Sequence, residues 1–557
     1  VNTSLVASQG TAIAEAINLA IKSFSDDERS KAIVIISDGE DYSVQESAGT
    51  YSNNWYKVKL KRPLDMFATY QDENFKAVPL NDTGFMNDEM HINVSDEAIV
   101  LTDKAKGIAK IKIPKELSQV KNKKADYFAN SSLYYKSQWA DAYRPILYSD
   151  SQYIYFSLNS WLTERAGDYV TNMYNWSVRH GEKGIQPMFI TNLPIAQREG
   201  TVMYDKQYIY IPKDVKSLHV SRYNQFLNVT NHKGVVTLRN ITFAGTCLSQ
   251  LVTAWNGYDS SVPKQLLSFS SSAQANIIKC TFKNMGGIIC TLESTNGLME
   301  SNNMIENYID NALNVSGVCN NVVFKKNYVN NPEKVLTRGV VISQNDARTF
   351  IAEGNTFINV SRTAFNHGTA KLDSYILVKN NELYNTQRVN KYARRYLSSD
   401  TGALVYSWNN SRIVIDGNVI HDLASNLNYS GIMIDDGSGH ATISNNLIFM
   451  VGDKAVYSWM NGGDKEIGLL NVMSGNIILG SCTFGGYKRT HPQNARYYKN
   501  ILLDISDTEA TDAGRNVIIS PITINISDKV YLPKSLYKKY KSIPFVKNYI
   551  GYYTKSK

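Results

Sequence analysis

The chain has 557 residues, of which 43% are hydrophobic and 20% are charged, and its formal net charge is +9. This composition excludes a disordered chain, because it supplies enough apolar residues for large cores. The positive charge is spread thinly, with no dense run of Lys and Arg, which disfavours a nucleic-acid partner. No run of 18 apolar residues is present, so the sequence predicts no membrane span.

The first 42 residues predict half of an α/β domain. Apolar residues at helical spacing in "GTAIAEAINLAIKSF" (10–24) predict a helix, and "AIVIIS" followed by "DGED" predicts a buried strand ending in an acidic loop. These stretches resemble the von Willebrand factor A domains of bacterial Bat-type proteins. The resemblance implies that Thr11 and Asp38 match two residues that help to hold Mg²⁺ in that family.

The rest of that magnesium site is missing from the sequence. The family's Asp-x-Ser-x-Ser loop should lie upstream of Thr11 and is absent. Two contributors without the remaining ligands do not make a tight site for a hard cation. We therefore expect a domain remnant that binds no Mg²⁺ tightly, and we expect a deletion of residues 1–42 to leave the remainder folded.

Residues 43–233 predict a β-rich accessory region that leads into the next domain. Short alternating runs such as "WYKVKLKR", "IAKIKIP" and "RPILYSDSQYIYFSL" are typical of strands separated by polar turns. The stretch "EGTVMYDKQYIYIPKDVKSLHV" predicts two strands joined by a turn at Asp205 and Lys206.

From residue 234 to about 525 the chain is periodic. An Asn precedes an apolar pair or triplet at spacings of 28, 26, 37, 28 and 30 residues, and less regular members precede the series at Asn303 and near "IIKCTFKNMGG". The six regular members are Asn327, Asn355, Asn381, Asn418, Asn446 and Asn476. Repeats of this size with short β runs are typical of a parallel β-helix, whose rungs stack about 4.8 Å apart. We predict a mainly β fold, a right-handed parallel β-helix, with a C-terminal tail at 526–557.

Stacking of the rungs predicts a row of polar and aromatic side chains at one edge. The runs that precede the Asn motifs put these residues in the row: Gln344, Asp346, Asn366, His367, Trp408, Asn409, Asp435, Asp436, Trp459 and Asn461. The 37-residue interval predicts a protruding loop that brings Arg394, Arg395 and Asp400 beside Trp408. Asp464, Glu466, Lys488, Arg489 and His491 follow the row.

Carboxylates and aromatic rings along a groove suit a carbohydrate, because Trp and Tyr faces stack on sugar rings. Asp435 or Asp436 is the preferred acid or base of a glycosidase. The catalytic candidates are Asp435, Asp436, His367, Asp464 and Glu466. The substrate-binding candidates are Trp408, Trp459, Asn366, Asn409, Arg394, Arg395, Lys488, Arg489 and His491. The same residues also suit blander roles: a tight turn at 435–437, a hydrogen-bonded turn histidine at His367, and a solvated surface pair at Lys488 and Arg489.

The motifs around the row also resemble a known family. The stretch "SGIMIDDGSGHATISNNLIFMVGDKAVYSW", with "NVMSGNIILGS" and "KRTH", resembles the secreted β-helix proteins related to pectate lyases, in particular the glycoside hydrolase branch that includes plant-polysaccharide fucosidases and xylanases. The likeness spans roughly residues 56–506. It implies a secreted, periplasmic or cell-surface glycoside hydrolase of a plant or host polysaccharide. A non-catalytic glycan-binding protein and a polysaccharide lyase stay open as alternatives.

Cofactors and disulfides are not predicted. The odd number of cysteines and their wide spacing argue against a disulfide framework, and no CxxC pair suggests zinc. We expect buried free thiols at Cys247, Cys280, Cys290, Cys319 and Cys482. Binding of Ca²⁺ on the coil stays open. No signal peptide is visible, and because the chain begins with Val1 we expect any targeting segment to lie upstream.

Overall fold

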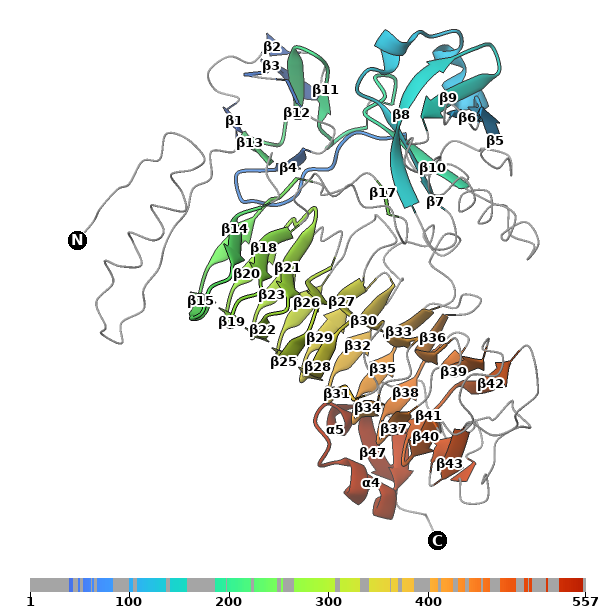
Figure 1. Cartoon of the computed structure of the whole chain (residues 1–557). Coiled ribbons are helices and arrows are strands. Elements are labelled where there is room, and N and C mark those ends of the chain that lie inside the picture. Colours follow the sequence, from blue (N-terminus) through green and yellow to red (C-terminus); the bar gives the residue numbers. More distant parts are fainter. Residues whose placement is uncertain are drawn as a thin grey trace.

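The chain folds mainly into strands, parallel in a long coil and antiparallel before it (Figure 1). Most of the remnant predicted at residues 1–42 lies outside the described residues, namely residues 1–39 with Thr11 and Asp38. The computed structural model describes residues 40–43, 49–50, 54–61, 63–64, 68–83, 100–103, 108–136, 141–157, 186–196, 198–221, 225–247, 252–253, 265–305, 311–330, 340–360, 362–368, 373–384, 401–408, 412–423, 429–435, 440–451, 454–460, 471–486, 495–498, 500–502, 517–518 and 530–553.

Three parallel sheets form the coil, and the prediction of a parallel β-helix is confirmed. The first coil sheet contains β14 (Leu227–Thr230), β18 (Gln265–Ser270), β21 (Ile288–Glu293), β24 (Leu313–Ser316), β27 (Val340–Gln344), β30 (Thr363–His367), β33 (Thr401–Ser407), β36 (Tyr429–Ile434), β39 (Lys454–Met460) and β42 (Ser481–Gly486). The second contains β15 (Val235–Arg239), β19 (Gln274–Ile278), β22 (Asn296–Glu300), β25 (Cys319–Lys325), β28 (Ala347–Glu353), β31 (Tyr375–Lys379), β34 (Arg412–Asp416), β37 (Ala441–Ser444), β40 (Asn471–Ser474) and β43 (Ala495–Tyr498). The third contains β16 (Thr242–Ala244), β20 (Thr281–Lys283), β23 (Asn303–Ile305), β26 (Tyr328–Asn330), β29 (Thr356–Ile358), β32 (Glu382–Tyr384), β35 (Val419–His421), β38 (Leu447–Phe449), β41 (Ile477–Ile478), β44 (Ile501–Leu502) and β45 (Val517–Ile518).

Each rung contributes one strand to each sheet, and alternate side chains point into the coil. In β34, Ile413 and Ile415 are buried while the residues on either side of them are exposed or half-buried. The same alternation along the coil builds one continuous apolar core from Phe243 to Cys482. Parallel strand pairing starts at Leu227. The coil therefore begins before residue 234, the start that the sequence pattern predicted.

An asparagine ladder runs between the second and third coil sheets. Each Asn amide donates from Nδ2 to Oδ1 of the next Asn at 2.8–3.2 Å, and that oxygen also accepts the backbone N–H of the donating residue. The members are Asn302, Asn327, Asn355, Asn381, Asn418, Asn446, Asn476 and Asn500. All six regular Asn residues of the sequence pattern are therefore equivalent. The sequence predicted Asn303 as the earlier member. The structure shows that the member is Asn302, which is fully buried.

The turn that positions each ladder Asn depends on the residue before it. Lys326, Gly354, Asn380 and Gly417 have φ values of 54°, 66°, 51° and 65°, in the left-handed region that favours Gly and Asn. One such residue turns the chain sharply enough to send the next side chain inward.

Three antiparallel sheets precede the coil in the described part of the chain, and two of them are the larger ones. The seven-stranded sheet contains β10 (Gln186–Thr191), β7 (Ser132–Lys136), β8 (Asp141–Ser149), β9 (Tyr153–Ser157), β6 (Ile108–Lys112) and β5 (Val100–Asp103), with β17 (Val252–Thr253) paired to β8. The four-stranded sheet contains β11 (Met203–Tyr204), β12 (Tyr208–Pro212), β3 (Trp55–Lys59) and β2 (Gly49–Thr50). The 3-10 helices η1 (Lys115–Val120) and η2 (Ala125–Phe128) accompany the larger sheet, whose buried core includes Leu117, Val120 and Phe128.

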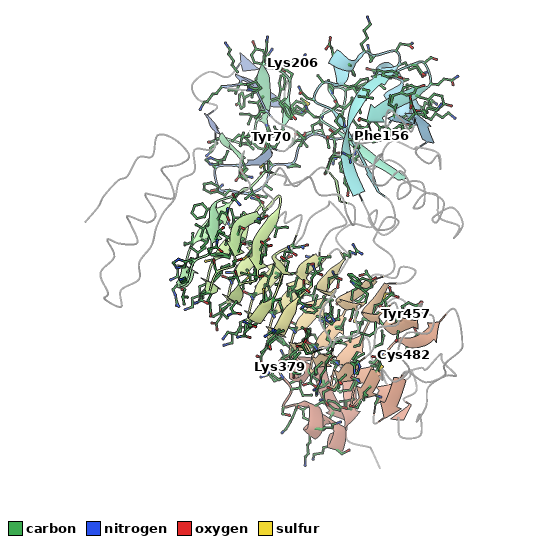
Figure 2. All side chains as sticks on the ribbon, in the orientation of Figure 1. Tyr70, Phe156, Lys206, Lys379, Tyr457 and Cys482 are labelled. Atoms are coloured by element: carbon green, nitrogen blue, oxygen red, sulfur yellow. The ribbon has the colours of Figure 1, made fainter. Side chains whose placement is uncertain are left out.

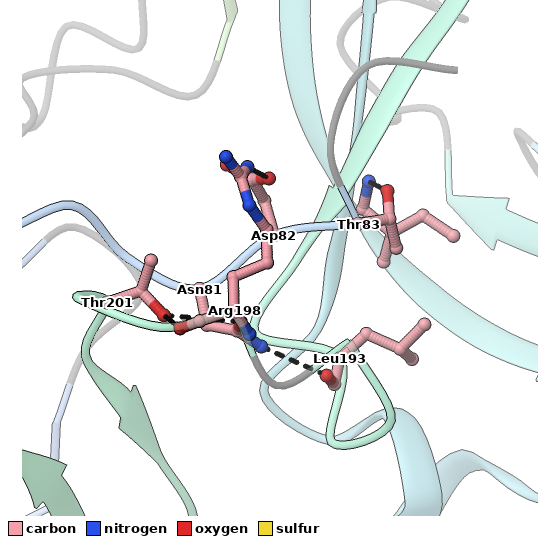
Figure 3. A network of polar contacts seen from close by, with 7 residues as sticks. Asn81, Asp82, Thr83, Leu193, Arg198 and Thr201 are labelled. Carbon is pink, nitrogen blue, oxygen red and sulfur yellow. Dashed lines mark hydrogen bonds and ion pairs between the residues drawn. The ribbon is translucent and has the colours of Figure 1, made fainter. Parts of the chain in front are cut away.

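A buried polar network joins these two sheets (Figure 3). The Asn81 amide donates to the carbonyl of Leu193, and its oxygen accepts the backbone N–H of Arg198. The Arg198 guanidinium in turn pairs with Asp82. Asn81 is fully buried, so its hydrogen bonds are made in place of bonds to water, whereas the Arg198–Asp82 pair is partly exposed. The network fixes the connection between β10 and β11.

A small end sheet closes the N-terminal end of the coil. It contains β1 (Glu40–Ser43), β13 (Ser217–Ser221) and β4 (Thr69–Gln71), with β13 in the centre. The Thr69 hydroxyl donates to the carbonyl of Thr246 beside the first rung. Because β1 spans residue 42, the predicted boundary at that residue falls inside a strand.

The segment predicted as a C-terminal tail is a packed cap. It contains β46 (Val530–Pro533), α4 (Lys534–Tyr540), α5 (Val546–Tyr549) and β47 (Ile550–Tyr553). Leu532, Tyr540 and Val546 pack on the outer face of the third coil sheet, against Leu447 and Ile477. Within the described segments, no helix has the length and apolarity required to cross a membrane.

Replacing Asn381 with Ala should destabilise the coil strongly. The substitution leaves the buried amide of Asn355 and the carbonyl of Ala352 without their partner, at a cost of about 1–3 kcal/mol for each orphaned group. Urea denaturation followed by circular dichroism measures the change. Asn321→Ala, at an exposed position of β25, is the matched control and should shift the midpoint little. Equal midpoints for the two variants would contradict a structural role for the ladder.

A pair of deletions tests the corrected boundary. Removal of residues 1–39 should leave the thermal transition unchanged, whereas removal of 1–43 also deletes β1 and uncovers one edge of β13. The second deletion should lower the free energy of unfolding by about 2 kcal/mol, because several strand hydrogen bonds are lost. Identical melting curves for the two truncated proteins would show that β1 contributes nothing.

Candidate active site

The strands of the first coil sheet end in a common column, here called the end column. Three backbone hydrogen bonds extend the ladder one residue past the strands: Gly368 N–H to Gln344 O at 2.8 Å, Trp408 N–H to His367 O at 3.3 Å, and Asp435 N–H to Ser407 O at 2.7 Å. The end column therefore contains Asn345, Gly368, Trp408 and Asp435 on successive rungs. Since Ile434 pairs with Ser458, the register places Trp459 next in the same column.

The strand register aligns Trp408, Asp435 and Trp459, whereas other members of the expected row lie at neighbouring positions of their strands. The sequence comparison placed Asn366 and His367 beside Trp408, whereas the structure pairs Asn366 with Tyr406 and His367 with Ser407. A shift of one residue exchanges the two faces of a strand. Asn366 consequently lies on the outer face, and His367 lies on the inner face.

Trp408 lies over a glycine on the preceding rung. A Cβ atom added to Gly368 would lie 3.2 Å from Cζ2 of Trp408 and 2.2 Å from Oδ1 of Asn345. Only a residue without a side chain leaves room for both groups. The indole Nε1 donates to Oδ1 of Asn366 at 3.3 Å. The ring is therefore held in one orientation by a hydrogen bond and by packing, and it remains partly exposed.

Asp435 is nearly buried and is held on both its main chain and its side chain. It is 4% exposed, its backbone N–H donates to Ser407, and its Oδ2 accepts the hydroxyl of Tyr406 at 3.0 Å. Tyr406 projects from the outer face of β33, directly before the strand end. The carboxylate thus has a fixed position on the rung that follows Trp408.

A repeated tripeptide surrounds the carboxylate. Tyr406-Ser407-Trp408 and Tyr457-Ser458-Trp459 occupy matching positions on β33 and β39, the strands on either side of β36. Asp435 follows β36, so it lies in the end column between the two Trp positions. The sequence comparison missed Tyr406, Asn345 and Gly368. The recurrence of Tyr-Ser-Trp, with Tyr two residues before Trp, was the signal that could have identified the tyrosine.

His367 lies inside the coil and is not presented at the surface. Its ring is fully buried, and Nδ1 lies 3.0 Å from the hydroxyl oxygen of Ser407. Burial lowers the pKa of His367 from its ordinary value of 6.5 to about 3, so the ring is neutral at physiological pH. We therefore leave His367 out of the set of side chains that could contact a substrate.

The remaining candidates lie outside the described residues. They are Asp436, Asp464, Glu466, Asn409, Arg394, Arg395, Lys488, Arg489 and His491. Trp459 is described only through its backbone position in β39. Among the described residues, no group of three or more His, Cys, Asp and Glu side chains is placed to hold a metal ion. The five cysteines are buried free thiols, as expected from their spacing.

Comparison with solved structures shows one similarity over most of the chain. A protein described as "Glycoside hydrolase" superposes with a TM-score of 0.58 at 12% identity, covering 79% of this chain and 82% of that protein. No family model and no curated protein matches the sequence. At this level of identity the similarity shows a shared fold. The comparisons give no support to the resemblance of the N-terminal residues to a von Willebrand factor A domain.

The burial of His367 makes stability depend on pH. Below pH 6.5 the unfolded chain binds a proton at His367 while the folded chain does not, until the pH approaches 3. Stability should therefore fall with decreasing pH, by up to about 1.4 kcal/mol per unit from this group alone. Urea denaturation between pH 7 and about pH 4 should give a steeper loss for the native chain than for His367→Gln. His440→Gln, at an exposed position, should follow the native curve. Parallel curves for the native chain and His367→Gln would contradict the assignment.

Proposed function

We propose that the protein is a glycoside hydrolase that acts on a polysaccharide at the end column of the first coil sheet. The observation that carries this proposal is the carboxylate of Asp435 fixed between two Tyr-Ser-Trp strands. An indole face beside an immobilised carboxylate is the combination required to seat a sugar ring and transfer a proton to its glycosidic oxygen.

Each described residue has a distinct proposed role. The Trp408 ring provides the stacking face for one sugar, and Gly368 leaves room for that ring to pack on the preceding rung. Asp435 is the proposed acid or base. Tyr406 is a positioning residue, because its hydroxyl donates to Oδ2 of Asp435 at 3.0 Å and fixes the direction of the carboxyl group. The second carboxylate of the reaction is proposed among Asp436, Asp464 and Glu466.

The wider assignment follows from the fold and the proposed chemistry. A polysaccharide substrate is too large to enter most cells, so we propose a secreted, periplasmic or cell-surface protein. The shared fold with a glycoside hydrolase supports hydrolysis over β-elimination by Lys488 and Arg489. For the N-terminal residues we keep the proposal of a domain remnant without a complete Mg²⁺ site.

Release of reducing sugar from a panel of plant and host polysaccharides tests the proposal. The native chain should release reducing ends from at least one polymer. Asp435→Asn should lower kcat on that polymer by about 10²–10⁴-fold, the usual contribution of a general acid or base. Trp408→Ala should raise KM about tenfold through loss of ring stacking. Asp214→Asn and Tyr328→Ala, at exposed positions outside the first coil sheet, are matched controls and should retain activity.

Two outcomes would redirect the proposal. Tight binding to a polymer without any release of reducing ends would indicate the non-catalytic glycan-binding alternative. Products that absorb in the ultraviolet because they carry a new double bond would indicate a lyase. Full activity of Asp435→Asn with normal folding would remove Asp435 from the mechanism.

A further inference from the structure

The N-terminal region contains the same hairpin twice. The sequence "DSQYIYF" (150–156) recurs as "DKQYIYI" (205–211), with Asp, Gln, Tyr, Ile and Tyr at matching positions. One copy enters β9 of the seven-stranded sheet, and the other enters β12 of the four-stranded sheet. The two sheets differ in their number of strands: β9 lies between β8 and β6, and β12 lies between β11 and β3. The similarity of the two hairpins is therefore not imposed by a shared position in the fold.

The two turns make the same hydrogen bonds. Oδ1 of Asp150 accepts the N–H groups of residues 152 and 153 at 2.7 Å each, and Oδ1 of Asp205 accepts those of 207 and 208 at 2.7 and 2.8 Å. The second Tyr of each copy donates its hydroxyl to Oδ2 of the same Asp, at 2.8 Å from Tyr155 and 2.7 Å from Tyr210. Both turn carboxylates are thus saturated by local donors, and these hydrogen bonds lower the pKa of Asp150.

The outer faces of the two hairpins also match. The ammonium group of Lys110 lies 3.9 Å from the ring centroid of Tyr153, and that of Lys57 lies 4.0 Å from the ring centroid of Tyr208. Each Lys belongs to the neighbouring strand, where it pairs with the second Tyr of the hairpin. All four side chains are partly exposed. Each hairpin therefore presents an ammonium group fixed over a phenol ring at the protein surface.

Folding of the hairpin does not require this outer face. The inward residues Ile154 and Ile209 are fully buried in separate cores, and the Asp residues close the turns. Those two features are sufficient to specify a hairpin from local sequence. The repetition of Tyr and Lys on the outside is an additional similarity, and it points to a ligand that meets both faces.

We propose that each hairpin face binds an acidic sugar residue, so that the N-terminal end of the molecule holds a uronic-acid polysaccharide at two points. The ammonium group supplies the partner for a sugar carboxylate, and the phenol rings supply apolar surface for the sugar ring. In the part of the chain that the structure describes, neither Lys57 nor Lys110 has a carboxylate within ion-pair distance, although the charge of Lys110 helps to lower the pKa of the nearby Asp150. Each ammonium group can therefore still approach a carboxylate of a ligand. The excess of basic residues over the whole chain has the sign that such a polymer requires.

The position of the two faces suits a role separate from the end column. Both hairpins lie at the N-terminal end of the coil, away from β33, β36 and β39 (Figure 1). Lys206, at the tip of the second hairpin, lies on that same end (Figure 2). Two weak sites on one protein raise the affinity for a polymer that spans both, without a new contact. The choice of a sugar polymer as the ligand rests on the proposed function.

Affinity electrophoresis of the full chain tests the proposal. Separate gels contain alginate or its propylene glycol ester. The ester keeps the sugar backbone of alginate and removes most of its negative charge. Alginate should retard the native protein and the ester should not. Lys57→Gln and Lys110→Gln should each raise the apparent Kd about fivefold, the upper range for one exposed charge pair, and the double variant should lose most of the retardation. Lys233→Gln with Lys279→Gln removes the same charge from exposed turns of the coil and is the matched control.

Each alternative gives a distinct result. Equal retardation of the native chain, the double variant and the control on alginate would overturn the proposal. Equal retardation by single-stranded DNA and by alginate would also overturn it, because it would indicate a general polyanion surface. Asp435→Asn and Trp408→Ala should retain the retardation even when they lose hydrolysis. Loss of polysaccharide hydrolysis as a function and loss of hairpin binding are therefore measured separately.

Discussion

The structure depends most on the buried amide of each ladder asparagine, which must be bonded within the coil because no water reaches it. One Oδ1 accepts both the side-chain and the backbone N–H of the preceding ladder Asn, while Nδ2 donates to the next member and to a strand carbonyl. A buried amide that makes all its hydrogen bonds stabilises the folded chain only modestly. Removing one of its partners lowers the free energy of unfolding by more than that hydrogen bond contributed, because a buried polar group is left without a partner. This asymmetry fixes the stacking of the rungs, and through it the spacing of the end column.

The coil interior beneath the proposed site contains polar side chains. Gln344, His367 and Ser407 occupy inward positions on three successive rungs, where most inward residues are apolar. The fully buried Gln344 amide makes no hydrogen bond to any residue that the structure describes, and such an orphaned amide costs about 1–3 kcal/mol. Their carbonyl oxygens hold the backbone of Gly368, Trp408 and Asp435. Local violations of polar satisfaction tend to collect at functional sites, and here the violation lies directly under the residues proposed to contact the substrate.

The spacing of the asparagines was sufficient to predict the coil, because one hydrogen-bonded residue recurs in every rung. The faces of the strands were harder to predict, since the pleat has a period of two and an alignment error of one residue exchanges inside and outside. Asn303 was chosen in place of Asn302 for this reason, and His367 was placed in one row with Trp408, where the register has Gly368. The C-terminal cap was missed because α4 and α5 are seven and four residues long, too short for a clear helical period. Their packing on the third coil sheet depends on contacts between residues far apart in the chain.

The ladder also explains how the coil accommodates long connections beside its rungs. The chain between Asn381 and Asn418 is 37 residues long and that between Asn476 and Asn500 is 24, yet the Nδ2-to-Oδ1 distances are 3.0 and 2.9 Å. The stacking distance is therefore the same beside a long connection and beside a short one. The entropy cost of closing a longer loop grows only slowly with its length, so the coil tolerates the insertion. The rungs carry the stability, and the connections between them are free to vary in length. A coil of this kind can change the side chains around a fixed carboxylate such as Asp435 by altering its loops, while the positions of Trp408 and Asp435 remain set by the strand register.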